Sequence, residues 1–190
     1  MGLCLMMKII FLLILFSFAL SCKAQQIYSL RPTEIDLSEN SYEKDTNNEL
    51  QDYVGIWKGT WDNKIILITF KKITNKYDNT LKRYRDYLIG KFIVKDNNGN
   101  ILFDNTNLAD DDAKIHGVSF RKYGDKYSLY YNDSELCNTT GSISIQFTNP
   151  TKTMLDWKYF YRNEIITSDC PYYNTGIPQP LPKEIILTKQ

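Results

Sequence analysis

The chain has 190 residues, with 23 basic and 22 acidic side chains and a formal net charge of +1. This balance excludes a global electrostatic attraction to nucleic acid or to an acidic membrane face. The length fits one domain with a sizeable core, and the 14 Tyr and 3 Trp, together with many Ile and Thr, favour strands over helices.

The chain opens with a short apolar leader. Lys8 precedes a mostly apolar run over residues 9–19, which is typical of a secretory signal peptide and is short for a membrane span of roughly 20 residues. Leu20-Ser21-Cys22 follows and resembles a bacterial lipobox, with Ala19 in the place where Leu is usual. The resemblance implies cleavage before Cys22 and lipidation of its thiol. Residues 1–22 are therefore interpreted as a signal peptide, and the alternatives are an uncleaved anchor or a plain secreted protein.

Residues 22–48 are interpreted as the lipid anchor and a flexible tether. The segment is polar and has no sustained apolar period, although Ile27, Tyr28 and Leu30 could pack on the domain. An extended chain covers up to about 3.3 Å per residue, which would hold the domain clear of the lipid headgroups. The folded domain is then expected over residues 49–190.

Residues 49–61 are predicted to form a short helical turn followed by a strand. Gly55 and Gly59 bracket Trp57, and glycine in a strand indicates a bend or a close backbone approach. Gly55-Ile56-Trp57 resembles the opening Gly-x-Trp motif of lipocalins and other calycin barrels. The resemblance implies that the Trp closes the floor of a barrel.

A strand is predicted over residues 64–73, where apolar side chains alternate on both faces. Residues 74–86 break this pattern and are interpreted as a loop or hairpin end. The main basic cluster lies here and just before it: Lys71, Lys72, Lys76, Lys82, Arg83 and Arg85. It could contact an anion or a lipid headgroup, but a solvated hairpin tip is favoured.

Residues 87–105 form the clearest local pattern, two apolar strands flanking Asn98-Gly99, which favours a type I′ hairpin turn. Residues 114–131 indicate a second hairpin, in which His116 is expected to be a partly buried strand residue rather than a catalytic base. Asp110-Asp111-Asp112 raises the question of a cation site, but adjacent carboxylates on an extended chain point in different directions. Further strands are predicted over residues 141–147, 153–162 and 184–188.

The four cysteines divide by position. Cys4 lies in the leader and Cys22 is the expected lipidation site, which leaves Cys137 and Cys170. A secreted chain matures where disulfides persist, so this pair is predicted to form one bridge, with two free buried thiols as the alternative. A zinc site is disfavoured because His116 is the only histidine.

These elements predict an all-β domain, a single antiparallel barrel of roughly eight to ten strands of the calycin-like type, with a two-sheet β-sandwich as the alternative. Several stretches resemble a family of small lipoproteins from flavobacteria and their relatives: SCKAQ, NSYEKDTNNELQDYVGIWKGTW, VKDNNGNILFDN and PLPKEIILTKQ. This resemblance implies a place in the cell envelope and no assigned activity.

The functional expectation is a non-enzymatic binding or interaction domain, because no nucleophile motif, metal cluster or phosphate-binding glycine loop can be placed. The alternatives are a barrel for a small apolar ligand and an inhibitor or immunity-type lipoprotein. No cofactor and no nucleic acid partner are expected. The protein is expected on the outer membrane through the Cys22 lipid, on the periplasmic face, because residues 23–26 lack the acidic run that resembles a surface-export signal.

Overall fold

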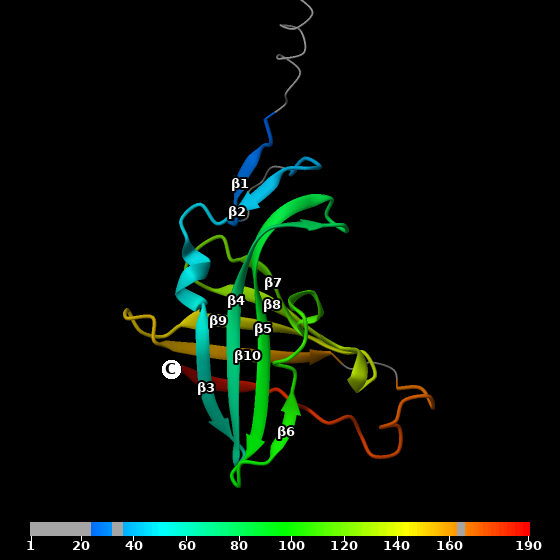
Figure 1. Ribbon diagram of the computed structural model, residues 1–190. Helices are drawn as coiled ribbons and strands as arrows, with labels where there is room; N and C mark the ends of the chain where they lie inside the picture. Colours follow the sequence, from blue (N-terminus) through cyan, green and yellow to red (C-terminus); the bar gives the residue numbers. More distant parts are fainter. Residues whose placement is uncertain (1–23, 32–35, 163–165) are drawn as a thin grey trace, which may run out of the picture.

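The chain closes into a barrel of antiparallel strands (Figure 1). The computed structural model describes residues 24–31, 36–162 and 166–190, so the predicted signal peptide and Cys22 lie outside the described residues. The barrel strands are β3 (Gly55–Trp61), β4 (Lys64–Asp78), β5 (Arg83–Asp96), β7 (Ile115–Phe120), β8 (Tyr127–Asp133), β9 (Thr139–Phe147), β10 (Met154–Arg162) and β11 (Glu184–Lys189).

Successive barrel strands pair with one another in chain order, including β5 with β7 across the inserted β6, and the pairing of β11 with β3 closes the circle. β11 returns to β3, with Thr188 opposite Lys58, and β5 pairs with β7, with Ile89 opposite His116. This up-and-down order removes the open sheet edges that a sandwich would leave. The predicted antiparallel barrel is confirmed.

Short elements decorate the barrel. They are the strands β1 (Ile27–Ser29), β2 (Tyr42–Lys44) and β6 (Ile101–Asp104), and the 3₁₀ helices η1 (Glu49–Tyr53), η2 (Asp110–Asp112) and η3 (Ser134–Leu136). β6 forms a hairpin with β5, as predicted. The predicted helical turn before Trp57 is η1.

The sheet extends into the segment interpreted as a tether. β1 pairs in parallel with β2, and β2 pairs in parallel with β5, where Tyr42 lies opposite Tyr84. The buried Asp86 carboxylate accepts hydrogen bonds from the Tyr42 hydroxyl at 2.6 Å and from the Asp45 backbone N–H at 2.9 Å. The described part of this segment is therefore bound to the barrel, and the β-structure begins before residue 49.

The hairpin between β4 and β5 is longer than predicted. Residues 74–86 were expected to be a loop, but β4 continues to Asp78 and β5 begins at Arg83. A register shift between Ile73 and Lys76 marks a bulge, and the Asp86 carboxylate accepts the Asn75 backbone N–H at 2.9 Å there. This bulge breaks the alternation of side chains, so the sequence pattern ends before the strand does.

The turn between β5 and β6 lies where it was predicted but is of another type. Gly99 has a positive φ of 85°, whereas Asn98 is not among the residues with positive φ, so a type I′ turn is wrong. The Asp96 carboxylate accepts the backbone N–H groups of Asn98 and Asn100. Its pKa is lowered by these hydrogen bonds, first of all the one from the Asn100 side chain. The Asp96 side chain thus organises the turn.

Trp57 lies at the end of the barrel that η1 covers, as the resemblance to calycin barrels implied. It is fully buried, its Nε1–H donates to the Tyr53 carbonyl oxygen at 2.7 Å, and the Lys189 Nζ lies 5.3 Å from its ring centroid. Gly59 allows a close approach, because a Cβ at this position would lie 2.5 Å from the Ile185 Cδ1. Side chains of β11 therefore pack directly against the backbone of Gly59.

Candidate functional site

Side chains fill the interior of the barrel. Ile68, Phe92, Leu129, Trp157 and Leu187 come from five different strands, and none of them is more than 2% exposed. An open ligand cavity would leave such side chains exposed to water, so this region is a packed core. A binding surface must therefore be sought at the ends or on the outside of the barrel.

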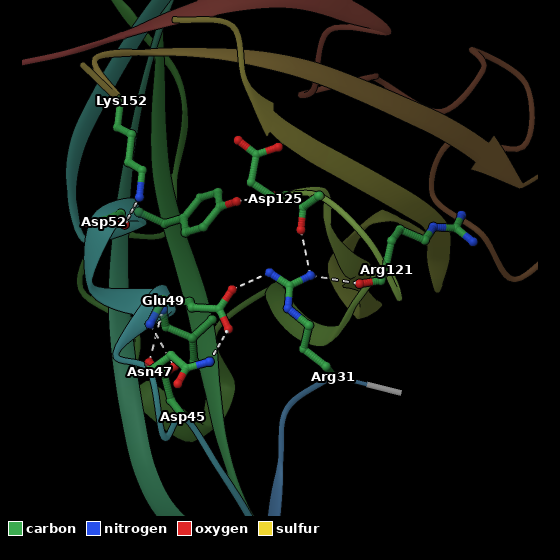
Figure 2. Close-up of polar contacts among 11 residues, drawn as sticks. Arg31, Asp45, Asn47, Glu49, Asp52, Arg121, Asp125 and Lys152 are labelled. Atoms are coloured by element: carbon green, nitrogen blue, oxygen red, sulfur yellow. Dashed lines mark hydrogen bonds and ion pairs between the residues drawn. The ribbon is translucent and has the colours of Figure 1, made fainter. Parts of the chain in front are cut away.

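One end is closed by the segment that precedes the barrel (Figure 2). The Arg31 guanidinium donates to the Arg121 carbonyl oxygen at 2.9 Å, forms an ion pair with Glu49, and lies 4.9 Å from the Phe120 ring centroid. The Tyr53 hydroxyl donates to the Asp125 carbonyl oxygen. These contacts attach Arg31 and η1 to the turn between β7 and β8, across the end of the barrel.

The opposite end is covered by the proline-rich segment before β11. Cys137 and Cys170 are joined by a disulfide with an S–S distance of 2.03 Å, so the predicted bridge is confirmed. Leu181 of the same segment is buried in the core, and the Trp157 Nε1–H donates to the Pro182 carbonyl oxygen at 3.0 Å. The disulfide thus ties this cover to the chain next to η3.

The outer face of β7–β10 carries a row of side chains in register. His116 lies opposite Tyr130, Tyr130 opposite Ser142, and Ser142 opposite Phe160. Phe160 is 60% exposed and Tyr130 is 39% exposed. Because neighbouring strands are about 4.8 Å apart, a small serine separates two aromatic side chains on strands about 10 Å apart. We call these four residues, His116, Tyr130, Ser142 and Phe160, the aromatic row.

A groove adjoins the aromatic row. A pocket of about 430 Å³ is lined by Asp111, His116, Tyr130, Asn132 and other residues around them. A second pocket of about 390 Å³ shares Asp111 and His116 and continues toward Tyr87. We call these two adjoining pockets the outer groove. It gives the outer face a concave, mixed aromatic and polar surface beside the exposed aromatic side chains.

His116 is partly buried in the outer groove, as predicted. Burial lowers its pKa, although a backbone hydrogen bond with Ala113 and the charge of Asp111 act in the opposite direction. The Tyr87 ring lies 6.5 Å from the His116 ring, between centroids, and burial raises the pKa of Tyr87. At neutral pH the His116 ring is therefore largely uncharged, and together with Tyr87 it forms an aromatic part of the groove wall.

The basic cluster does not form a free anion site. Each of its six cations has an acidic partner: Lys71 with Asp110, Lys72 with Asp45, Lys76 with Asp111, Lys82 with Glu39, and both Arg83 and Arg85 with Glu43. These pairs disfavour the alternative of an anion or headgroup contact. The favoured solvated hairpin tip describes Lys82, whose side chain is 62% exposed, but not Arg85, whose side chain is 13% exposed.

The three adjacent aspartates take part in this pairing. Asp110 lies 2.9 Å from Lys91 and also pairs with Lys71, and hydrogen bonds from these two lysines lower its pKa. Asp111 pairs with Lys76 at 2.8 Å. Two of the three carboxylates are thus held by lysines of the neighbouring strands β4 and β5. Across residues 24–31, 36–162 and 166–190, no group of three or more His, Cys, Asp or Glu side chains could hold a metal ion.

Sequence reasoning missed the aromatic row and the outer groove. The alternation of Ser142, Ser144 and Gln146 with Ile side chains indicated only that one face of this strand meets water.

None of the helices in the described ranges is long and apolar enough to cross a membrane.

Comparison with known proteins places the chain in a family. Residues 6–190 match the model of a family of unknown function (DUF6705). Neither a curated protein nor a solved structure matches the chain. Since the match spans nearly the full length, the protein belongs to this family of unknown function, DUF6705.

Proposed function

We propose that this protein is a cell-envelope lipoprotein whose barrel is a non-enzymatic binding domain for a protein partner. In this proposal the partner contacts the aromatic row and the outer groove. The observation that carries the proposal is the contrast between the packed interior and the exposed Tyr130 and Phe160 on one outer face. A domain that binds through its surface needs such exposed anchors and no cavity.

The chemistry of this face favours a protein partner. Tyrosine and phenylalanine supply large apolar area with little side-chain entropy to lose, and aromatic residues are enriched at the centres of protein interfaces. Ser142 leaves room between Tyr130 and Phe160 for a partner side chain. Asp111 and Asn132 supply hydrogen-bonding groups at the rim. The face therefore combines apolar anchors with a polar surround.

The two alternative functions differ in how well they agree with a packed barrel interior. A barrel for a small apolar ligand would need space that Phe92, Leu129 and Trp157 fill. An inhibitor or immunity-type lipoprotein is compatible with the proposal, because it is one kind of protein-binding lipoprotein. Its partner would be an enzyme or toxin that meets the protein in the envelope.

The lipoprotein part of the proposal depends on Cys22. The leader and lipobox-like Leu20-Ser21-Cys22 support attachment to the outer membrane, and residues 23–26 support the periplasmic face. Multiple acyl chains add roughly 0.8 kcal/mol per buried methylene, enough for stable attachment without a spanning helix. Membrane fractionation of the wild type and of Cys22→Ala in the native host tests this. A soluble wild type contradicts the proposal.

Site-specific photo-crosslinking in the native host tests the binding face. A photoreactive phenylalanine analogue replaces Tyr130 in one variant and Ile56 in a control. Ile56 is 46% exposed on β3, and β3 and β8 lie four positions apart in the circle of eight strands, so the two sites face opposite sides. We expect a defined protein adduct from position 130 and none from position 56, and Phe160→Ala should reduce that adduct.

Two outcomes contradict the proposed binding mode. One is equal crosslinking from positions 130 and 56, because it would show no preference for the aromatic row. The other is a stoichiometric small apolar molecule that native mass spectrometry detects in the purified protein, because the barrel would then open its core to a ligand.

A further inference from the structure

The spacing between the proposed anchor and the first strand is short. β1 begins at Ile27, five positions after Cys22. A fully extended chain covers at most about 3.6 Å per residue, so Ile27 can lie no more than about 18 Å from the lipidated cysteine. The long tether expected from composition is thus reduced to a few residues, because β1 is already bound to the rest of the sheet.

Hydrogen bonds fix β1 to the barrel, so the short spacing from Cys22 also limits the position of the barrel. β1 pairs with β2, β2 pairs with β5, and the Asn40 backbone N–H donates to the Lys82 carbonyl oxygen at 2.8 Å. β1, β2 and the tip of the β4–β5 hairpin lie at one end of the molecule, whereas β6 lies at the other (Figure 1). An anchor close to Ile27 therefore determines which end of the barrel faces the bilayer.

The same end presents apolar side chains to solvent. Ile27 is 57% exposed, and Leu81 and Tyr77 at the hairpin tip are also exposed. The nearby cation Lys82 pairs with Glu39 at 2.9 Å, so this end has no strong preference for anionic lipid. Isoleucine, leucine and tyrosine are side chains that the boundary between headgroups and acyl chains accommodates.

We infer that the short spacing from Cys22 to β1 holds this end of the barrel against the bilayer, with Ile27 and Leu81 at the level of the lipid headgroups. The inference rests on the proposed lipidation of Cys22 and adds an orientation to it. β6, in which Ile101 is 57% exposed, then lies at the end away from the membrane.

Spin labels on the lipidated mature protein, which begins at Cys22, test the orientation in phosphatidylcholine vesicles. Leu81→Cys and Ile101→Cys each introduce one free thiol, because Cys137 and Cys170 are bonded to each other and Cys22 carries the lipid. We expect the label at position 81 to be shielded from a water-soluble nickel chelate and open to oxygen. The label at position 101 should show the reverse.

A second variant tests the role of the spacing itself. Insertion of about twelve Gly and Ser residues between Gln25 and Gln26 lengthens the flexible connection without changing the barrel. We expect the insertion to make the label at position 81 as accessible to the chelate as the label at position 101. Shielding that persists after the insertion contradicts the inference.

Intact-mass measurement separates failure of the inference from failure of the proposed function. A mature chain without acyl groups contradicts the lipoprotein proposal and the orientation that rests on it. A lipidated chain whose labels at positions 81 and 101 are equally accessible contradicts the orientation alone.

Discussion

Asp86 joins three parts of the protein that are far apart in sequence. Its Oδ1 accepts the Tyr42 hydroxyl at 2.6 Å and the Asn75 backbone N–H at 2.9 Å, and its Oδ2 accepts the Asp45 backbone N–H at 2.9 Å. Asp86 is only 3% exposed. We predict that Asp86→Ala loosens residues 42–45 and the bulge of β4 at the same time.

The expected loss follows from what the substitution leaves unpaired. The Asp45 N–H is buried and loses its acceptor, which costs about 1–3 kcal/mol. The Tyr42 hydroxyl and the Asn75 N–H are nearer to solvent, so each loses only a net hydrogen bond of about 0.5–1.5 kcal/mol, or less where water replaces the carboxylate. These losses add up to about 2–6 kcal/mol. Because water replaces the carboxylate at the two groups nearer to solvent, we expect a decrease in the lower part of this range, roughly 2–4 kcal/mol, in the free energy of unfolding.

Urea denaturation of the domain that begins at Lys23 measures this change, followed by fluorescence of its tryptophans. Asp169→Ala is the control, because Asp169 is exposed and should change the free energy of unfolding by less than about 0.5 kcal/mol. Hydrogen exchange should also rise at residues 41–45 in Asp86→Ala. A loss no larger than that of the control, with unchanged exchange, would refute the reasoning.

Two further predictions concern the disulfide and the histidine. The bridge between Cys137 and Cys170 closes a loop with a sequence separation of 33, so the double substitution to Ser should lower the free energy of unfolding by about 3–4 kcal/mol in urea, and an unchanged midpoint would contradict this. Burial lowers the pKa of folded His116 below its unfolded value of about 6.5, so the unfolded state takes up more protons there. The wild type should therefore lose more stability than His116→Gln as pH falls from about 7.5 through the folded pKa, and parallel stability profiles for the two proteins would contradict this.

Local patterns in the sequence were enough for the strand content and for the disulfide. Side chains such as Ile143 and Ile145 alternate with serines, and this period alone predicts a strand with one covered face. The parity of the remaining cysteines predicted their bridge. The Gly-x-Trp resemblance led to Trp57 at the end that η1 covers, because this motif consists of three adjacent residues.

Contacts between distant residues decided the rest. Composition predicted a tether over residues 22–48. Pairing of β2 with β5 and hydrogen bonds to the Asp86 carboxylate hold part of this segment, and both depend on residues that only folding brings near. The basic cluster could not be assigned from sequence, because its partners Glu39, Asp45 and Asp110 lie in other segments. A local pattern cannot specify a partner that only the closed barrel brings within hydrogen-bonding distance.

The candidate binding face has the same origin. Tyr130 and Phe160 are 30 positions apart in the chain and meet across β9 only in the register that the barrel adopts. Whether the interior would be open or filled also depended on the three-dimensional packing, since the same aromatic and aliphatic residues can line a cavity or fill one. Sequence alone determined the kind of strands. Tertiary structure determined that their large side chains fill the core and that Tyr130 and Phe160 lie on one outer face, because both results depend on side chains from strands that touch only after the barrel closes.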